Sequence, residues 1–277
     1  MALFDDELME QLGLEAPCVC PEGSVESSGK HLSNEMDRIH TEHSECDVIE
    51  TCGRSDEDIK VLRNLIQTYD RNRQDATTGD FWYAARVLEV SDPGMQFSLW
   101  LGDVEDALNT DALRARGIMA IINVALGDCR FWMGQNRWTD AGFSEAWYRE
   151  RLGCADFWYL AIAAEDEVDY PLHQHFDESS SFLRQCKEAG RSVLVHCMNG
   201  ENRSAAVCAA FLMDEGTGQC EKGLTVREAV ERLASRRPRI LRNVGFLRQL
   251  VDFEESVACL CTTTTHTSHL PGPAGPD

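Results

Sequence analysis

The chain has 277 residues, of which 47 are acidic and 26 are lysine or arginine, so its formal net charge at pH 7 is −21. The charge is −12 over residues 1–80 (19 acids against 7 bases) and −9 over residues 81–277 (28 against 19). Both parts therefore argue against nucleic acid or an anionic membrane surface as a partner. No apolar run approaches the roughly 20 residues of a membrane-spanning helix, and the acidic run Asp5–Glu7 is unlike a secretory leader.

Twelve cysteines are present, but their spacing does not predict a metal site. The pairs Cys18–Cys20 and Cys259–Cys261 lack a strong zinc-ligand spacing, and no histidine pair accompanies them. We expect reduced thiols, no metal or other cofactor, and a cytoplasmic location, with a nuclear one left open.

Composition divides the chain into an acidic, disordered N-terminal region, a helix with a linker, one folded domain and a disordered tail. The expected bounds are 1–56, 57–80, 81–258 and 259–277. Within the first part, apolar residues fall at helical spacing over Leu3–Leu12, which predicts either a partner-binding helix or a nascent helix without a partner. An apolar stripe over Asp58–Tyr69 predicts a helix that packs on the folded domain.

The folded domain opens with aromatic, alternating stretches. They predict strands over Trp82–Val90 and Phe97–Leu101, joined by a turn at Asp92–Gly94. A helix over Asp106–Arg116 and a strand over Ile118–Val124 are then expected to complete a β-α-β unit.

A long connection, Gly127–Gly153, follows and carries Trp132, Trp138 and Trp147. Long aromatic insertions often bind partners. The tryptophans could equally pack the insertion onto the domain, so both interpretations stay open here.

After a predicted strand over Phe157–Ile162 comes a loop with four acidic residues. They are Glu165, Asp166, Glu167 and Asp169. Any of the four carboxyl groups could act as a general acid in a reaction that needs a proton for its leaving group.

The segment Ser192–Met213 has the pattern of a buried strand, a small polar loop and an apolar helix. This arrangement directs backbone N–H groups and the positive end of a helix at one point, which favours an anion. Cys197 opens the loop and Arg203 closes it. The pattern therefore predicts that the anion is attacked as well as bound.

Each residue of this loop has a chemical reason for its place. Cys197 would be the nucleophile, as a thiolate favoured by the N–H groups and Arg203, whose planar fork suits phosphoryl oxygens. Gly200 would let the backbone turn back and approach the ligand, and Ser204 would donate a hydrogen bond to the sulfur. The alternative is a buried structural cysteine with an incidental arginine. The combination with His196, Gly200 and Ser204 favours catalysis.

His-Cys-x-x-Gly-x-x-Arg-Ser, at His196–Ser204, resembles the signature of the cysteine-dependent protein phosphatases. Over roughly residues 84–255 the chain resembles their dual-specificity branch, with similar flanking blocks at Ala210–Met213 and Arg236–Leu247.

Three positions depart from the pattern of that branch. Asn199 stands in place of the usual alanine, Asn202 in place of serine, and Arg242 in place of proline. These departures leave the nucleophile and Arg203 intact.

The resemblance implies an α/β fold, with a central, mostly parallel sheet flanked by helices on both faces and the site at the carboxyl end of the strand Ser192–His196. It implies phosphate binding by Met198, Asn199, Gly200, Glu201, Asn202 and Arg203, with His196 as a supporting residue. Because Ile162–Asp166 is similar to the Ile-Pro-Ala-x-Asp of the family, the resemblance also makes Asp166 the general acid and the other three acids solvated loop charges.

The function implied is a metal-independent phosphoprotein phosphatase, acting on phosphotyrosine and phosphoserine or phosphothreonine through a cysteinyl-phosphate intermediate. One alternative is a phosphate-binding interaction module of low activity. Another is a phosphatase for phosphoinositides or RNA 5′-phosphates, which Glu201 in the loop argues against. The partner expected is a phosphorylated protein, with a further partner at the N-terminal acidic segment or at Gly127–Gly153.

The end of the domain contains a basic cluster, Arg236, Arg237, Arg239 and Arg242. It is interpreted either as a patch that binds an acidic or second phosphorylated residue of a substrate, or as local neutralisation of nearby carboxylates. Thr225–Glu228 predicts a capping box for the helix before it, and Asn243 predicts the cap of a final helix over Val244–Val257.

Overall fold

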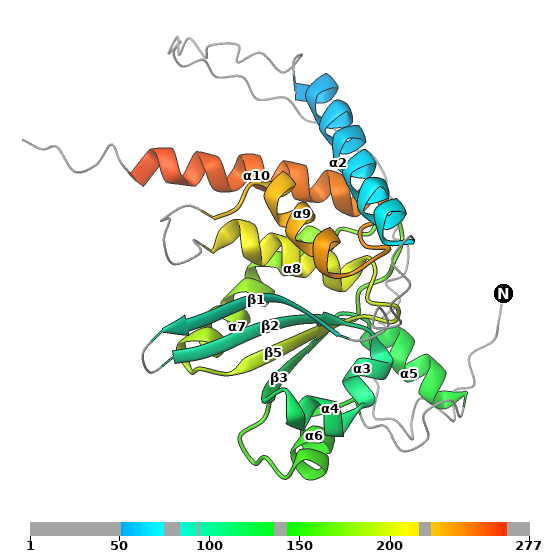
Figure 1. The fold of residues 1–277 in the computed structure, drawn as a ribbon, viewed down its shortest axis with the longest axis vertical. Helices are drawn as coiled ribbons and strands as arrows, with labels where there is room; N and C mark the ends of the chain where they lie inside the picture. The colour runs from blue at the N-terminus through cyan, green and yellow to red at the C-terminus, as the bar shows by residue number, and fades with distance from the viewer. Residues whose placement is uncertain (1–50, 75–83, 93–94, 136–142, 216–222, 265–277) are drawn as a thin grey trace, which may run out of the picture. The chain divides into compact units, whose positions relative to one another are not determined.

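The computed structural model describes residues 51–74, 84–92, 95–135, 143–215 and 223–264, all within the compact unit Asp47–Asp277 (Figure 1). The strands are β1 (Ala85–Asp92), β2 (Met95–Gly102), β3 (Ile118–Asn123), β4 (Trp158–Ala161) and β5 (Ser192–His196). The helices are α2 (Thr51–Gln74), α3 (Val104–Leu108), α4 (Thr110–Ala115), α5 (Leu126–Gly134), α6 (Glu145–Leu152), the 3-10 helix η1 (Leu172–His175), α7 (Phe176–Glu188), α8 (Arg203–Asp214), α9 (Val226–Arg236) and α10 (Val244–Thr264).

The five strands form one sheet in the order β1-β2-β5-β3-β4. Only β1 runs antiparallel to its neighbour, and the other three pairings are parallel. The register pairs Gly102 and Asn123 with His196, and Ala161 with Asn123. Four strands therefore end at the same edge of the sheet, and the loops that follow them converge there. The predicted α/β fold with a mostly parallel sheet is confirmed.

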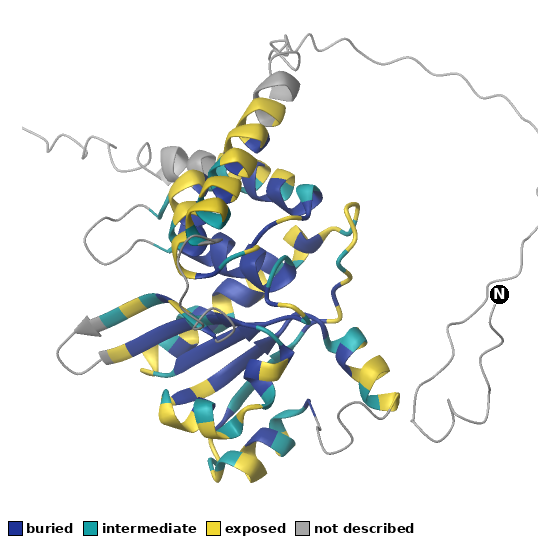
Figure 2. Ribbon diagram, turned by 45° about the vertical axis from the view of Figure 1, so that its right-hand side comes forward, coloured by how far each residue is buried: buried dark blue, intermediate teal, exposed yellow. Residues whose placement is uncertain are grey.

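Helices cover both faces of the sheet, as predicted. Side chains alternate along β5, so that Val193 and Val195 pack beneath α7, α8, α9 and α10, while Leu194 faces the opposite side. Figure 1 shows α8, α9 and α10 on one side of the sheet and α4 and α6 on the other. All five residues of β5 are buried, and Figure 2 shows the inner strands and α8 in the buried colour. Burial of each Val or Leu side chain contributes about 1.5–3 kcal/mol, which makes β5 a rigid support for the loop after it.

The segment expected as one helix over Asp106–Arg116 is two short helices, α3 and α4. That prediction was wrong because one helix starts before the segment, at Val104, and a side-chain cap at Asn109 starts a second helix inside it. Asp103 and Asp106 form a capping box at the start of α3, and the Asn109 side chain accepts a hydrogen bond from the Ala112 N–H at the start of α4.

The two terminal helices are longer than expected. Helix α2 starts at Thr51, inside the region predicted to be disordered, and α10 continues to Thr264, inside the predicted tail. Ile59, Leu62 and Ile66 of α2 are buried in the main core, so the prediction that this helix packs on the domain is confirmed. The possible helix at Leu3–Leu12, the rest of the N-terminal region and residues 265–277 lie outside the described residues.

The insertion contributes α5 and α6 to the described structure. Tyr148 of α6 is buried and stacks on Phe157 at 5.1 Å, and Trp147 packs against the same cluster. Packing onto the domain is thus the role of Trp147. Trp132 of α5 is 40% exposed, and Trp138 lies outside the described residues.

Candidate active site

The loop from His196 to Arg203, called the phosphate loop below, connects the end of β5 to the start of α8. Cys197 is 1% exposed and Arg203 is 3% exposed, and every residue of α8 from Arg203 to Met213 is buried. The predicted sequence of strand, loop and helix is therefore confirmed, and it brings the thiol and the guanidinium group to the same edge of the sheet.

Four consecutive carbonyl oxygens of the phosphate loop accept hydrogen bonds from outside it. The pairs are Val104 N with Met198 O at 3.3 Å, Arg237 Nη2 with Asn199 O at 3.3 Å, Arg237 Nε with Gly200 O at 3.0 Å, and Leu241 N with Glu201 O at 2.8 Å. Within the part of the chain that the structure describes, the N–H groups of residues 198–202 donate to no other residue. With the carbonyl groups bonded outward, these N–H groups are free to bind an anion.

Gly200 has φ of 65° and lies against the chain rather than against an open space. A Cβ built there would lie 2.6 Å from Gly102 O and 2.5 Å from Arg237 Nη2. The glycine was expected to let the backbone turn and approach a ligand. The left-handed turn is present, and the close contact with the end of β2 is a second reason for a glycine.

The sulfur of Cys197 has one hydrogen-bond donor from α8, because the Ser204 hydroxyl donates to Sγ at 3.2 Å. His196 is fully buried, and its Nδ1 lies 3.3 Å from Cys197 O. Burial lowers the pKa of His196 to about 4, so the ring is neutral near pH 7, and Nδ1 carries the proton because the carbonyl oxygen can only accept.

Two hydrogen bonds from Nη1, on one side of the guanidinium group, orient Arg203. Nη1 donates to Asp128 Oδ2 at 2.7 Å and to Ala164 O at 2.8 Å, while the buried Nε–H makes no hydrogen bond among the described residues. Burial alone would lower the pKa of this guanidinium, but the charges of Cys197, Asp128 and Asp166 raise it. Its remaining donors are thus available for phosphoryl oxygens.

Asp128 was not among the residues predicted from the sequence. It lies in the first turn of α5, 75 residues before Arg203 in the chain. The only available signal was an acidic residue soon after β3, a strand that ends at the same edge as β5.

The loop Ala163–Asp169, called the acid loop below, follows β4. Its Asp166 is partly buried, and Oδ2 lies 3.9 Å from Arg203 Nε. Asn202 Nδ2 donates to that oxygen at 3.1 Å, and Asn243 Nδ2 donates to Oδ1 at 3.1 Å. The other three acidic candidates, Glu165, Glu167 and Asp169, are exposed.

Three of the four arginines in the basic cluster contact carboxylates. Arg237 is buried and pairs with Asp103 at 3.0 Å, Arg239 pairs with Glu201 at 3.1 Å, and Arg242 lies 3.8 Å from Asp70. These contacts favour local neutralisation over a free anion-binding patch. Arg237 also anchors the phosphate loop, a role that the sequence analysis did not predict. Asn243 caps α10 as expected, since its Oδ1 accepts from Gly245 N at 3.0 Å.

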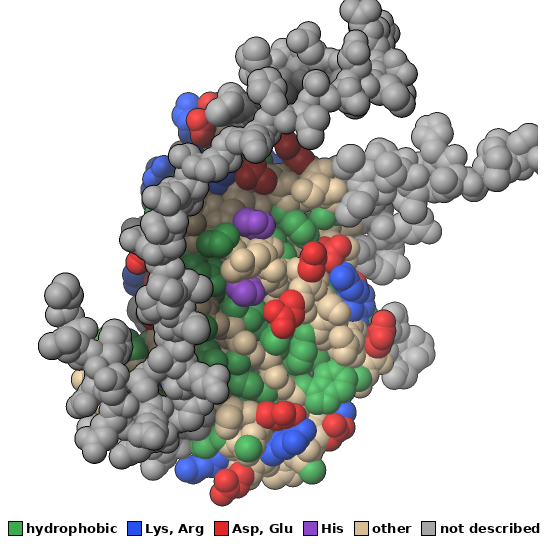
Figure 3. All heavy atoms as spheres, turned by 180° about the vertical axis from the view of Figure 1, so that it is seen from behind, with side chains coloured by type: hydrophobic (Ala, Val, Ile, Leu, Met, Phe, Trp, Pro, Cys, Tyr) green, Lys and Arg blue, Asp and Glu red, His purple; other side chains and the backbone are tan. Residues whose placement is uncertain are grey.

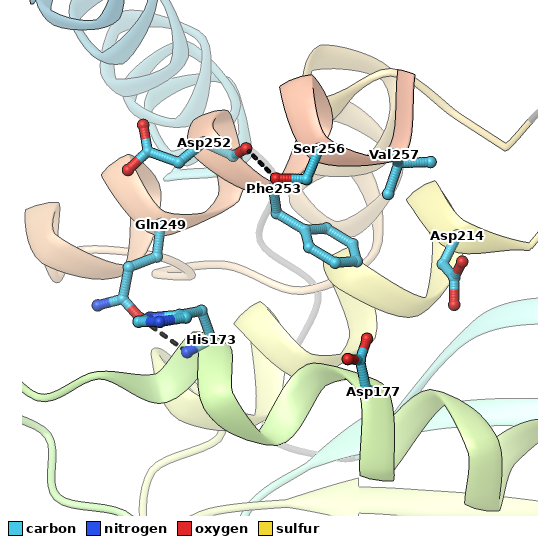
Figure 4. Close-up of a pocket in the computed structure, with 8 residues that line it drawn as sticks. All are labelled: His173, Asp177, Asp214, Gln249, Asp252, Phe253, Ser256 and Val257. Atoms are coloured by element: carbon cyan, nitrogen blue, oxygen red, sulfur yellow. Dashed lines mark hydrogen bonds between the residues drawn. The ribbon is translucent and has the colours of Figure 1, made fainter. Parts of the chain in front are cut away.

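A hollow of about 440 Å³ lies elsewhere, between α7 and α10 (Figure 4). Its lining includes His173, Asp177, Asp214 and Phe253, and none of the predicted site residues. Asp214 is paired with Arg184 at 2.5 Å, and the His173 ring lies 3.1 Å from Gln249 Oε1. Among the residues described, the hollow brings together neither a nucleophilic cysteine nor an arginine, so the phosphate loop remains the candidate site.

The described surface mixes charges of both signs. The face in Figure 3 carries acidic, basic and hydrophobic side chains side by side, with no broad basic area among the residues described there. None of the described helices combines the length and apolar character needed to cross a bilayer. No group of three or more His, Cys, Asp or Glu side chains in the described ranges is arranged to hold a metal ion.

Comparison with known proteins adds an independent observation. Residues 99–256 match the family model described as dual specificity phosphatase, catalytic domain. The chain is 38% identical over 102 residues to dual specificity protein phosphatase 1 of Arabidopsis thaliana, covering 37% of this chain and 48% of that protein. It is 30% identical over 163 residues to dual specificity protein phosphatase 1B of Arabidopsis thaliana, covering 59% of this chain and 81% of that protein.

Among solved structures, that of DUSP15 is similar with 26% identity and a TM-score of 0.48, covering 68% of this chain and 98% of that one. The chain thus spans about half the length of one of the two Arabidopsis proteins and about four fifths of the other.

Proposed function

This chain belongs to the family of dual specificity phosphatase catalytic domains, and we propose that it removes phosphate from phosphotyrosine and phosphoserine or phosphothreonine in proteins. One observation carries the proposal: the phosphate loop presents a thiol, unpaired N–H groups and a free guanidinium edge together, with a carboxyl group beside them. An electrophilic anion with three terminal oxygens fits this set of donors.

In the first step, the thiolate of Cys197 attacks phosphorus in line with the ester bond. The S–P bond forms and the P–O bond to the substrate breaks. The N–H groups of residues 198–202 and Arg203 hold the equatorial oxygens, and Asp166 gives its proton to the departing oxygen.

In the second step, water attacks the cysteinyl phosphate. Asp166, now a carboxylate, accepts a proton from the water as the O–P bond forms and the S–P bond breaks. The Ser204 hydroxyl, 3.2 Å from Sγ, stabilises the thiolate that leaves. Inorganic phosphate is released, and both Cys197 and Asp166 return to their starting states.

The side chains of the loop support a protein substrate over a phosphoinositide. Glu201 places a carboxylate in the loop, and burial raises its pKa while Arg239, Arg242 and Arg237 oppose that rise. Highly charged substrates favour basic side chains at this place. The rival function, a phosphate-binding module of low activity, is disfavoured because the nucleophile, its hydroxyl donor and a carboxyl group are all present.

The remaining parts of the proposal concern the whole chain. We assign the catalytic domain to 81–258 and an N-terminal helix with a linker to 57–80, of which the helix packs on the domain through Ile59, Leu62 and Ile66. A further partner would bind the N-terminal acidic segment or Gly127–Gly153. Cys129, Cys154, Cys186, Cys197 and Cys208 are free thiols, which supports a reducing compartment, the cytoplasm or the nucleus.

Hydrolysis of two phosphopeptides, one with phosphotyrosine and one with phosphothreonine, tests the proposal. Purified protein should release phosphate from a phosphotyrosine peptide and from a phosphothreonine peptide faster than from a phosphoinositide. The variant Cys197→Ser should release no phosphate but should still bind tungstate. Turnover by the serine variant at more than a few per cent would contradict the mechanism. Tungstate binding without wild-type turnover would favour the binding module.

A further inference from the structure

The Asn202 side chain joins three segments at the edge of the phosphate loop. Its Nδ2 donates to Asp166 Oδ2 at 3.1 Å, and its Oδ1 accepts from the backbone N–H groups of Arg242 at 2.7 Å and of Asn243 at 3.0 Å. Backbone N–H groups can only donate. The amide oxygen must therefore face them, which leaves the amide nitrogen to face Asp166.

Asn243 closes a ring with Asn202 and Asp166. Its Nδ2 donates to Asp166 Oδ1 at 3.1 Å and to Glu167 O at 3.2 Å. Each oxygen of the carboxyl group thus receives one amide N–H, from two different parts of the chain. The oxygen that Asn202 holds, Oδ2, is the one that lies 3.9 Å from Arg203 Nε. Asn202 therefore acts on the side of the carboxyl group that faces the catalytic arginine.

The residue type matters because the dual-specificity pattern has serine at this position. A serine hydroxyl ends one bond beyond Cβ. The carboxamide of Asn202 carries its oxygen and nitrogen two bonds beyond Cβ, on opposite sides, and each makes its own contacts. A single hydroxyl oxygen does not span the distance between Asp166 and the Arg242–Asn243 backbone.

We propose that Asn202 is a positioning residue for Asp166, which fixes the carboxyl group of the acid loop relative to the start of α10 so that proton transfer begins from a defined geometry. This inference rests on the proposed function. In the described structure, no hydrogen bond of the Asn202 side chain goes to Cys197 or Arg203. Only the part of catalysis that needs the acid should therefore depend on it.

The test compares two leaving groups. Phenyl phosphate needs a proton on its leaving oxygen, whereas dinitrophenyl phosphate needs little help. Asn202→Ala should lower kcat/KM for phenyl phosphate about tenfold, a fraction of the ~10²–10⁴-fold that a general acid contributes. For dinitrophenyl phosphate the loss should stay below about twofold. Glu165→Ala, which alters an exposed acid in the same loop, is the control and should change neither value.

A double-mutant cycle separates this role from general support of the loop. In an Asp166→Ala background, Asn202→Ala should cause no further loss with phenyl phosphate, because the group it positions is gone. Asn202→Ser provides a second variant, expected to show the same dependence on the leaving group. Unchanged tungstate binding by both variants shows that the phosphate loop is intact.

Equal losses with both substrates, or a further loss in the Asp166→Ala background, would overturn the inference, and so would wild-type rates for Asn202→Ala with phenyl phosphate. Failure of the proposed function has a different signature. If Asp166→Ala itself shows no dependence on the leaving group, the acid assignment is wrong and the positioning role falls with it.

Discussion

The phosphate loop and the acid loop meet at one site, but different kinds of interaction hold them. The phosphate loop continues a fully buried strand into a buried helix, and four of its carbonyl oxygens accept hydrogen bonds from elements around it. In the acid loop, five of the seven residues are exposed. Its carboxyl group is held by the side-chain amides of Asn202 and Asn243.

The difference shows which interactions determine the geometry of the nucleophile and which determine the geometry of the acid. The geometry of the nucleophile depends on strand order and core packing, which single surface substitutions do not alter. The geometry of the acid depends on a few side chains from distant parts of the chain. Changes to Cys197 or Arg203 should therefore affect every substrate. Changes to the acid loop, or to Asn202 and Asn243 that hold its carboxyl group, should affect substrates according to their leaving groups.

Asp166→Ala tests this contrast with the largest expected effect. With phenyl phosphate, kcat/KM should fall by about 10²–10⁴-fold, because the leaving oxygen no longer receives a proton. With dinitrophenyl phosphate the loss should be much smaller. Steady-state rates for both substrates give the comparison directly.

The exposed acids of the same loop are the controls for that variant. Glu165→Ala, Glu167→Ala and Asp169→Ala should leave both rates nearly unchanged. A small, equal loss for all four variants would mean that the loop acts only through its negative charge. A selective loss at Asp169 would move the acid to that residue.

Arg203→Lys is the matching change in the phosphate loop. An ammonium group cannot reproduce the planar fork, and loss of one such donor from a site that stabilises developing negative charge costs about 10²–10³-fold in kcat. The loss should be equal for phenyl and dinitrophenyl phosphate, and tungstate should bind more weakly. Arg236→Lys, on the exposed face of α9, is the control. A loss confined to phenyl phosphate would break the contrast between the loops.

Burial of the phosphate loop also predicts how stability depends on pH. The folded state keeps His196 neutral with a pKa of about 4, whereas the unfolded chain takes up a proton below about 6.5. The unfolded state therefore binds more protons between pH 6.5 and 4, and stability should fall as the pH drops through that window, by about 2 kcal/mol from pH 7 to pH 5.

Asp106 opposes part of this change. Burial, with Asp103 beside it, raises the pKa of Asp106 to about 6, so the folded state binds the extra proton between about pH 6 and 4. Urea unfolding at pH 7 and pH 5 measures the sum of the two effects. Asp106→Asn should steepen the loss of stability on acidification, and His196→Asn should flatten it. An unchanged slope in His196→Asn would show that the histidine is not the group that titrates.

Those parts of the site that lie close together in the sequence could be predicted from it. The strand, the loop and the helix of Ser192–Met213 are contiguous, and apolar runs with a compact motif identify them. The strands of the sheet were predicted from several apolar or alternating runs of the same kind. Likewise, the capping box at Thr225 is local and was predicted correctly.

The parts that could not be predicted join residues far apart in the chain. Asp128 is 75 residues from Arg203, and Asn243 is 77 residues from Asp166. No periodicity links such pairs. Asp128 and Arg203 come together because the parallel strands β3 and β5 end at one edge of the sheet, and Asn243 reaches Asp166 because α10 packs against α8 and η1. The break at Asn109 was missed for another reason: the apolar spacing continued through it, while the Asn109 side chain caps the start of a second helix.

Arg203 joins the two loops, and removal of Asp128, one of its two partners, should have the smallest effect and sharpen the comparison most. Arg203 Nη1 donates both to Asp128 Oδ2 and to the carbonyl oxygen of Ala164 in the acid loop. Asp128→Ala removes one of the two, and because the Asp128 side chain is 48% exposed, the expected loss in kcat/KM is about threefold to tenfold. The loss should be the same for both leaving groups, since Asp128 contacts the arginine and not the acid. Glu145→Ala, which breaks an exposed ion pair with Arg149 in the same insertion, is the control and should change neither rate. A gain in kcat/KM would show that Asp128 competes with phosphate for Arg203 instead of orienting it. A loss confined to phenyl phosphate would mean that Asp128 acts through the acid loop, by way of the shared contact at Ala164.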